Sequence, residues 1–197
     1  MKIKALIPVL ALVLVCQTAP AQSGDASLAE SYYQYVPAVA DLGLGLVGVK
    51  CANGLGDRAI ELAVAYASEV IIVNAVLKNV VSEERPDGSA YNSFPSGHTA
   101  TAFTGAELVR LEYGWGWGAG AYAVATAVGV MRVVHERHHW WDAAAGAGIG
   151  ILCANIGRWS VKPIKGLFGA GTDATLSVAP AVDPYSGALC AALALKF

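Results

Sequence analysis

Three polar clusters, at residues 78–86, 95–98 and 132–142, interrupt a sequence that is otherwise mostly apolar. Each cluster lies at the end of an apolar segment, where an oriented backbone and a polar pocket can meet. Together they supply lysine, arginine, serine, glycine, histidine and aspartate. These residue types can hold a tetrahedral oxyanion, attack it and protonate the group that leaves.

Two cations come from the first cluster and one from the third. Lys78 and Arg85 are seven residues apart, which is two helical turns and predicts that both lie on one helix face. Pro86 disfavours helical geometry at the residue before it, so Arg85 is expected at or just past the helix end. Lysine provides a point charge, whereas the planar guanidinium groups of Arg85 and Arg132 can each contact two phosphate oxygens.

The second cluster is predicted to begin a helix at Ser96, Gly97 and His98. Backbone N–H groups at a helix N-terminus have no partner within the helix, and the helix dipole is positive there, so this end binds anions. Gly97 has no side chain and lets the backbone come close to a ligand.

The third cluster places His138 and Asp142 four residues apart on a predicted helix. This spacing predicts that Asp142 accepts a hydrogen bond from one imidazole nitrogen, which fixes the tautomer and leaves the other nitrogen as a nucleophile. With three cations, a helix N-terminus and a second imidazole at His98, the pattern predicts a site for phosphoryl transfer.

These clusters resemble the signature of the type 2 phosphatidic acid phosphatase and vanadium haloperoxidase superfamily. That signature reads Lys-x6-Arg-Pro, then Pro-Ser-Gly-His, then Ser-Arg-x5-His-x3-Asp, and the chain matches its order and spacing within roughly residues 58–158. Met131 stands where the family has serine, which puts one minor polar contact in doubt. Three motifs in the right order are far more specific than any one of them.

The resemblance implies a role for each matching residue. His138 would be the nucleophile that forms a phosphohistidine, Asp142 would orient it, and His98 would be the general acid for the leaving oxygen. The phosphate would be held by Lys78, Arg85, Ser96, Gly97 and Arg132. The resemblance implies neither a cofactor nor a metal.

Three other functions are weighed against a lipid phosphatase. Residues 135–139 read His-Glu-x-x-His, the zincin pattern, which requires one continuous helix and a third ligand and leaves the first two clusters unexplained. A vanadate-dependent haloperoxidase would use the same pocket for peroxide-dependent halide oxidation. A non-catalytic membrane scaffold would not need His138 at all.

The composition favours a membrane protein. Of 197 residues, 55% are hydrophobic and only 14% are charged, against about 25% charged in a typical soluble domain. The net charge is −2 and no long basic run occurs, which argues against nucleic acid as a partner. The expected partners are a lipid phosphate substrate and the membrane, although a soluble periplasmic bundle of the same fold is an alternative.

The chain divides into three parts by its pattern. Residues 1–23 have a charged start, an apolar run and a small-residue site, which predicts a signal peptide or an uncleaved first helix. Residues 24–165 are predicted to form an all-α, membrane-embedded helical bundle of the phosphatidic acid phosphatase type 2 and haloperoxidase kind. Residues 166–197 contain alternating apolar positions around a turn, which predicts a C-terminal β-hairpin.

Membrane topology brings the three clusters together. If the predicted helices alternate across the membrane, all three clusters lie at the outer face, and the inner loops carry most of the remaining basic residues. The sequence therefore predicts a metal-independent phosphatase that removes the phosphate or pyrophosphate of a membrane lipid through a phosphohistidine. Its active site would face the periplasm or the cell exterior.

Overall fold

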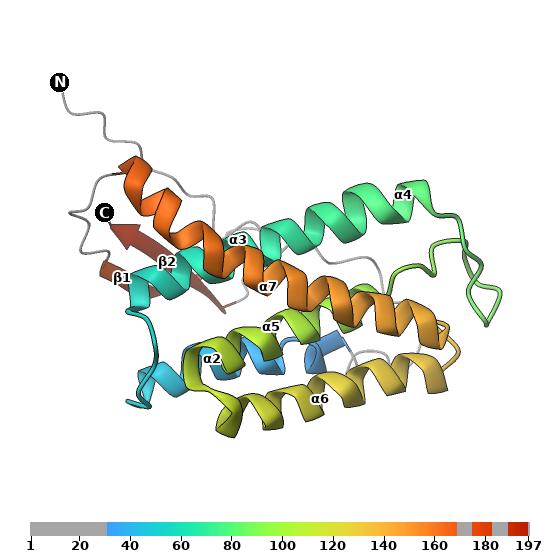
Figure 1. Ribbon diagram of the computed structural model, residues 1–197, viewed down its shortest axis with the longest axis horizontal. Coiled ribbons are helices and arrows are strands. Elements are labelled where there is room, and N and C mark those ends of the chain that lie inside the picture. Colours follow the sequence, from blue (N-terminus) through green and yellow to red (C-terminus); the bar gives the residue numbers. More distant parts are fainter. Residues whose placement is uncertain (1–30, 169–174, 183–188, 197) are drawn as a thin grey trace.

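A computed structural model describes residues 31–168, 175–182 and 189–196 of the chain (Figure 1). The predicted signal peptide lies outside the described residues. In chain order the elements are α2 (Val36–Leu46), α3 (Leu55–Val70), the π-helix η1 (Ile71–Leu77), α4 (Lys78–Val80), α5 (Gly97–Tyr113), α6 (Trp115–Val134), α7 (Trp140–Phe168), β1 (Thr175–Val182) and β2 (Leu189–Lys196).

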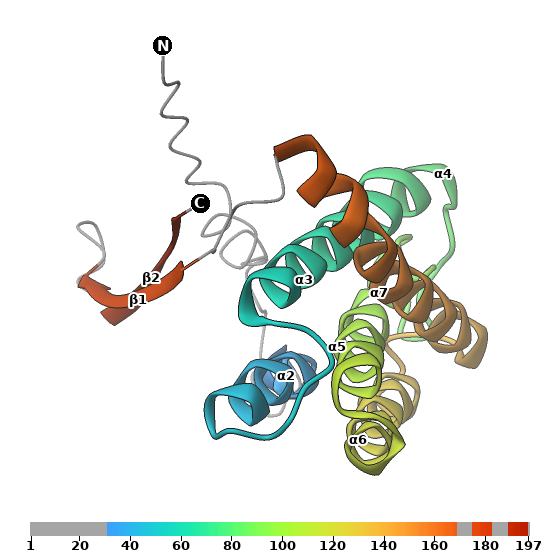
Figure 2. The same cartoon turned by 60° about the vertical axis from the view of Figure 1, so that its left-hand side comes forward.

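The bundle is built around α5, which packs against α7, α6 and α2, while α7 also packs along α3. Figures 1 and 2 show α7 crossing the bundle between α3 and α5, with α6 on the opposite side of α5. Most of α5 from Thr99 to Val109 is buried, and Ala102, Ala106 and Val109 form the main apolar cluster with α6. The predicted helical bundle is thus confirmed as a mostly helical fold.

Small residues let α5 and α7 approach closely. A methyl group added at Gly146 would lie 2.5 Å from the carbonyl oxygen of Ser96, and one at Gly150 would collide with the carbonyl oxygen of Ala100. Real Cβ atoms do not come that close to backbone atoms, so these two glycines set the separation of the helices. Because α5 begins at the second polar cluster and α7 at the third, their separation also sets the geometry of the site.

Substitution of Gly150 by alanine should destabilise the fold, although alanine favours helix. Overpacking typically costs about 1–3 kcal/mol, so the apparent melting temperature of Gly150→Ala in detergent should fall. Gly148→Ala is the matched control on the same helix, because nothing lies within 4 Å of the added methyl group. Helix propensity alone should stabilise this variant by up to about 1 kcal/mol. Equal melting temperatures for the two variants would contradict the close packing.

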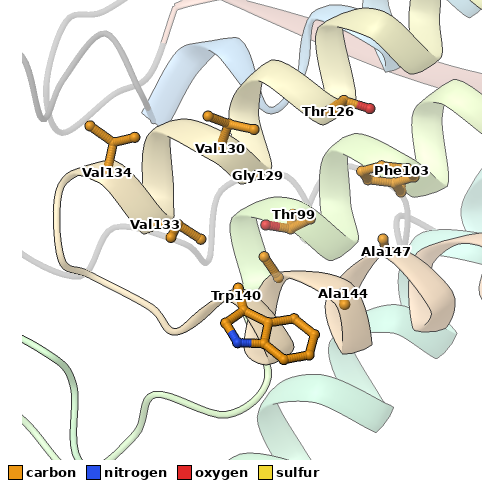
Figure 3. Close-up of a pocket in the computed structure, with 11 residues that line it drawn as sticks. Thr99, Phe103, Thr126, Gly129, Val130, Val133, Val134, Trp140, Ala144 and Ala147 are labelled. Atoms are coloured by element: carbon orange, nitrogen blue, oxygen red, sulfur yellow. The ribbon is translucent and has the colours of Figure 1, made fainter.

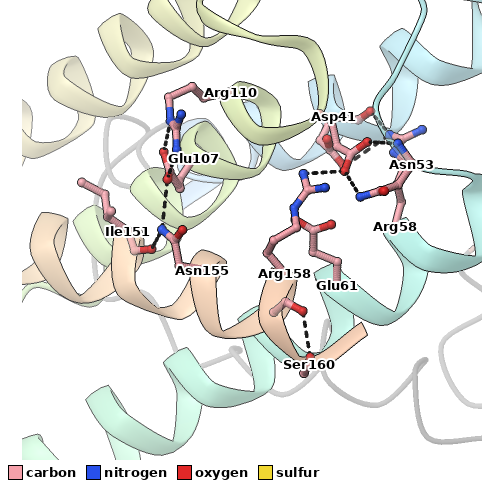
Figure 4. A network of polar contacts seen from close by, with 12 residues as sticks. Asp41, Asn53, Arg58, Glu61, Glu107, Arg110, Ile151, Asn155, Arg158 and Ser160 are labelled. Carbon is pink, nitrogen blue, oxygen red and sulfur yellow. Dashed lines mark hydrogen bonds and ion pairs between the residues drawn. The ribbon is translucent and has the colours of Figure 1, made fainter. Parts of the chain in front are cut away.

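Charged side chains join four helices at the end of the bundle away from the start of α5 (Figure 4). Arg58 of α3 pairs with Asp41 of α2 at 3.3 Å, and Arg158 of α7 contacts Glu112 of α5 at 2.7 Å and Glu61 of α3 at 3.0 Å. All three carboxylates and Arg58 are buried. Breaking such a pair leaves a buried charge without compensation, so the network specifies which helices are neighbours.

Two helical stretches in the described part of the chain, Leu55–Val80 and Trp115–Val134, have the length and apolar composition needed to cross a membrane. They correspond to α3 with η1 and α4, and to α6. Core helices of soluble proteins can meet the same criterion.

Strands β1 and β2 pair antiparallel, in a register that runs from Thr175 opposite Lys196 to Val182 opposite Leu189. The segment that would join them, residues 183–188, lies outside the described residues. The C-terminal hairpin therefore stays a prediction.

Candidate active site

The three polar clusters lie at one end of the bundle. Figure 1 shows the end of α4, the end of α6 and the start of α7 at the same end, with the start of α5 between them. Segments that are more than fifty residues apart in the sequence therefore contribute side chains to one region. The reason is topological: consecutive long helices are antiparallel, so the loop from α4 to α5 and the loop from α6 to α7 both lie at this end, whereas α5 and α6 are joined at the opposite end.

The first cluster departs from the expected single helical face. The helix ends at Val80, so Arg85 lies in the following loop, where its N–H donates to the carbonyl of Ala90 at 2.9 Å. The seven residues just before Lys78 form the π-helix η1, and π segments are frequent at functional sites because they change the direction of the next side chain. Lys78 is therefore aimed by the π turn and Arg85 by the loop, rather than both by one α-helix.

The second cluster begins α5 as predicted. Ser96 is the N-cap residue, and its hydroxyl accepts from the N–H of Thr99 at 3.4 Å and contacts the Thr99 hydroxyl at 2.9 Å. A methyl group added at Gly97 would lie 3.7 Å from the ammonium nitrogen of Lys78. The positive end of α5 and the Lys78 ammonium thus face the same space.

The third cluster closes the site. Arg132 is buried in the last turn of α6, and its carbonyl accepts from the N–H groups of Arg137 at 3.1 Å and His138 at 3.2 Å. These two bonds fold the loop between α6 and α7 back over the helix end. They hold the His138 backbone next to the residue that provides the third cation.

His138 is oriented by a backbone carbonyl and not in the way the spacing predicted. The Nδ1 atom of His138 lies 2.7 Å from the carbonyl oxygen of Ser93, but 3.8 Å from the nearest Asp142 oxygen. A carbonyl only accepts hydrogen bonds, so Nδ1 carries the proton and Nε2 keeps its lone pair. One ring nitrogen is thus fixed by a hydrogen bond and the other is left as a possible nucleophile, as expected, but the partner is the Ser93 carbonyl and not Asp142.

Asp142 instead holds the segments around His138. Its Oδ2 atom accepts from the Ser93 hydroxyl at 2.5 Å and from the N–H of His139 at 2.9 Å. Because α7 starts at Trp140, Asp142 occupies the third helical position and reaches back to the residue before the helix, as in a capping box. Asp142 and Ser93 are both fully buried, so this carboxylate fixes the loop that carries the Ser93 carbonyl.

The two imidazoles lie within reach of the same positive charges. Burial and the charges of Arg132 and Lys78 lower the pKa of His98 to about 3, and burial with Arg132 and Arg85 lowers the pKa of His138 to about 3. Both imidazoles are therefore neutral near pH 7 when no anion is bound. The electrostatics show that all three cations converge on both histidines.

Two residues that sequence reasoning missed belong to this region. Ser93 makes the two contacts just described, with His138 and with Asp142. Arg137 pairs with Asp87 at 3.0 Å, and its charge helps to lower the pKa of His98 and of Arg85. Ser93 is only three residues before Ser96, and its carbonyl acts through the backbone, so no side-chain pattern marks it. Arg137 directly precedes His138, and this position is the sequence feature that could have identified it as part of the site.

The His-Glu-x-x-His pattern lies in a loop. Helix α6 ends at Val134, α7 begins at Trp140, and Glu136 has a left-handed backbone with φ of 53°. His135 and His139 therefore do not lie one turn apart on a helix, which the zincin arrangement requires.

A family model described as the PAP2 superfamily matches residues 58–164, which is more than half of the chain. The chain belongs to the PAP2 superfamily. The resemblance that the three clusters carry is thereby confirmed, and the matched region contains all of them.

Two known proteins are similar to this PAP2 chain. A lipid A 1-phosphatase of Porphyromonas gingivalis is 40% identical over 131 residues, which is 64% of this chain and 29% of that protein. This chain thus spans less than a third of the length of that relative. The crystal structure of Aquifex aeolicus LpxE matches with a TM-score of 0.54 at 23% identity, covering 80% of this chain and 98% of that chain. The second match shows that the PAP2 chain has the fold of that structure.

The low histidine pKa values predict that this PAP2 protein loses stability as the pH falls. Between about pH 3 and 6.5 the unfolded chain binds protons at His98 and His138 that the native state excludes, so stability rises with pH across this window. Each fully titrating imidazole can contribute up to about 1.4 kcal/mol per pH unit. Melting temperatures in detergent should fall from pH 7.5 to pH 5. Added orthophosphate should reduce that fall by offsetting the cations. A melting temperature that stays flat over this range would contradict the low pKa values of the two imidazoles.

Proposed function

We propose that this PAP2 chain is a metal-independent phosphatase that removes phosphate from a membrane lipid through a phosphohistidine. The observation that carries the proposal is the convergence of the buried His138 imidazole, the half-buried His98 imidazole and three cations at the N-terminus of α5. Phosphoryl transfer depends mostly on positioning and on stabilisation of negative charge, and this end of the bundle provides both.

His138 is the proposed nucleophile. Because its Nδ1 proton is directed at the Ser93 carbonyl, Nε2 presents its lone pair to the phosphorus. Attack forms the Nε2–P bond and breaks the bond between phosphorus and the leaving oxygen. Lys78, Arg85 and Arg132, with the free N–H groups of α5, stabilise the charge that develops on the other three oxygens.

His98 is the proposed acid and base. The same cations that lower its pKa are offset when a negatively charged phosphate ester binds, so the pKa of His98 rises and the imidazolium can form. It gives its proton to the leaving oxygen in the first step. In the second step it accepts a proton from the water that attacks phosphorus, which releases orthophosphate and restores His138.

The lipid nature of the substrate is inferred from the relatives and from the apolar helices. The name of the Porphyromonas gingivalis relative suggests a phosphate of lipid A as the first substrate to test. We infer that α3 with η1 and α4, and α6, span the membrane, and that the site opens to the periplasm or cell exterior. Trp140 and Trp141, which follow His138 and are exposed, suit the interface between water and lipid.

The decisive experiment is release of inorganic phosphate by the purified chain in detergent, with lipid A 1-phosphate, phosphatidic acid and an isoprenyl diphosphate as substrates. Each reaction is run with and without a chelator. We expect release from at least one lipid that is insensitive to the chelator and inhibited by vanadate. Complete inhibition by the chelator, or no release from any lipid, would refute the proposal.

Removal of the Ser93 hydroxyl should impair turnover more than binding. Ser93→Ala takes away one of the two donors to Asp142 and loosens the loop whose carbonyl holds His138. A lost hydrogen bond to a buried charge corresponds to about 1.5–3 kcal/mol, so kcat should fall roughly ten- to a hundredfold with KM nearly unchanged. Ser93→Thr, which keeps the hydroxyl, should restore most of kcat. If KM rises while kcat is kept, Ser93 does not position the nucleophile.

A further inference from the structure

A pocket of about 330 Å³ opens between α5, α6 and α7 (Figure 3). Its walls include Thr99 and Phe103 of α5, Gly129 and Val133 of α6, and Trp140 of α7. The lining side chains are apolar apart from two threonines. The pocket runs along about two turns of each flanking helix, which is roughly 10 Å.

One lining residue of this pocket, Thr99, also contacts a residue of the proposed phosphate site. Thr99 turns its methyl group toward Gly129, where an added Cβ would lie 3.2 Å from it, and its hydroxyl contacts the N-cap Ser96 at 2.9 Å. Val133 follows Arg132 directly, and Trp140 is two residues after His138. Each of the three helices therefore contributes to the pocket one residue that lies within two sequence positions of a site residue.

The outer rim of the pocket is apolar and open. Val130, Val134 and Trp140 are 54%, 68% and 68% exposed, a cluster of large apolar surfaces that is unfavourable in water and favourable against hydrocarbon. The helix that carries the first two is one of the two helices in the described part of the chain that are apolar enough to span a membrane. The volume is at the small end of ligand sites, which range from roughly 300 to 1,000 Å³, and matches part of one chain better than several.

We propose that this pocket takes a hydrocarbon chain of the lipid phosphate whose headgroup occupies the site. The proposal rests on the proposed function and adds to it how the lipid is selected. The cations hold the scissile phosphate, and the hydrocarbon chain extends from it into the groove between α6 and α7, past the loop that carries His138. Burial of each methylene group in the pocket then adds to the affinity for long-chain substrates.

The first test fills the pocket and measures dependence on chain length. Ala144 lines the pocket from α7, and its side chain is exposed, so leucine can extend into the pocket without separating helices. For phosphatidic acids of increasing chain length, kcat/KM should rise until the pocket is filled. Ala144→Leu should lower kcat/KM for long chains about tenfold relative to short chains, since the displaced methylene groups lose their burial. Thr126→Leu, from the opposite wall, should act in the same way.

The matched control is Ala127→Leu, the same change at an exposed position of α6 that does not line the pocket. It should keep the chain-length dependence of the wild type. If Ala144→Leu and Thr126→Leu also keep it, the pocket does not hold the chain. If they instead convert a detergent-solubilised dimer to a monomer with the dependence unchanged, the groove is an interface between copies, and the proposal is overturned.

A binding measurement separates this proposal from the proposed function. An alkyl phosphonate with a brominated chain cannot be hydrolysed, and bromine quenches tryptophan fluorescence on contact. If the quenching is saturable, is removed by Trp140→Phe and is weakened by Ala144→Leu, the chain lies in the pocket. This conclusion would hold even if no lipid were dephosphorylated, and only the phosphatase proposal would then fail. Quenching that is the same in the wild type and Trp140→Phe would refute the pocket while leaving the phosphatase intact.

Discussion

Substitution of His138 by alanine is expected to reduce the release of inorganic phosphate from the lipid substrate by about 10⁴-fold or more. The substitution removes the atom that attacks phosphorus, and no other imidazole in the described residues has both its burial and its carbonyl partner. The remaining cations still bind the phosphate, so the affinity for orthophosphate should change far less than kcat. Both quantities are measured on the same preparation, by phosphate release and by competitive inhibition.

The matched control for this prediction is His135→Ala, which removes an exposed imidazole three residues away in the same loop. Its kcat should stay within about twofold of the wild type, as is usual for surface substitutions. Rapid denaturation in base during turnover should trap acid-labile phosphate on the wild-type chain and on His135→Ala, but not on His138→Ala. Labelled His138→Ala would show that another residue is the nucleophile.

The conservative change Arg85→Lys is expected to lower kcat/KM by about 10²- to 10³-fold, which is the usual effect of losing one transition-state donor. Lysine keeps the charge but loses the planar fork that contacts two phosphate oxygens. The Nε atom of Arg85 is buried and has no hydrogen-bond partner among the described residues. Such a donor is satisfied when an oxyanion binds, and a shorter lysine without it cannot fulfil the same role.

Arg137→Lys provides the comparison, because this arginine is paired with Asp87 at the rim, where more than a third of its side chain is exposed. The pair is screened by water, so the same change there should cost less than about tenfold. Steady-state kinetics with one lipid and with a soluble phosphate ester measure both variants. Equal losses at the two positions would show that charge alone, and not the fork at Arg85, binds the phosphate.

Local sequence was sufficient to predict the helix beginning at the Pro-Ser-Gly-His cluster. A capping hydroxyl, a glycine and an apolar segment all act within a few residues, and Ser96 caps α5 as expected. The long apolar helices were predicted for the same reason. The prediction that Lys78 and Arg85 lie on one helix face was wrong. It assumed a regular α-helix, whereas a π-helix precedes Lys78 and the helix ends at Val80, before Arg85.

The contact between His138 and Asp142 shows the limit of spacing arguments. Four residues bring two side chains to one face only if both lie within a helix, but His138 precedes α7, which starts at Trp140. The carboxylate is instead used to cap the helix and to hold Ser93, a residue forty-five positions before His138. A backbone carbonyl has no sequence signature, so its role could be seen only in the folded chain.

The amino-acid sequence by itself determined which groups are the candidates for the site: the three cations, the two imidazoles and the helix that begins at Ser96 follow from residue types and short spacings. Tertiary structure alone decided how these groups meet. Close packing of glycines brings α5 against α7, the loop after α4 turns Arg85 back toward the bundle, and the Ser93 carbonyl selects the tautomer of His138. The physical reason is that side-chain chemistry and helix capping act over a few residues, whereas distances between segments depend on the packing of the whole bundle.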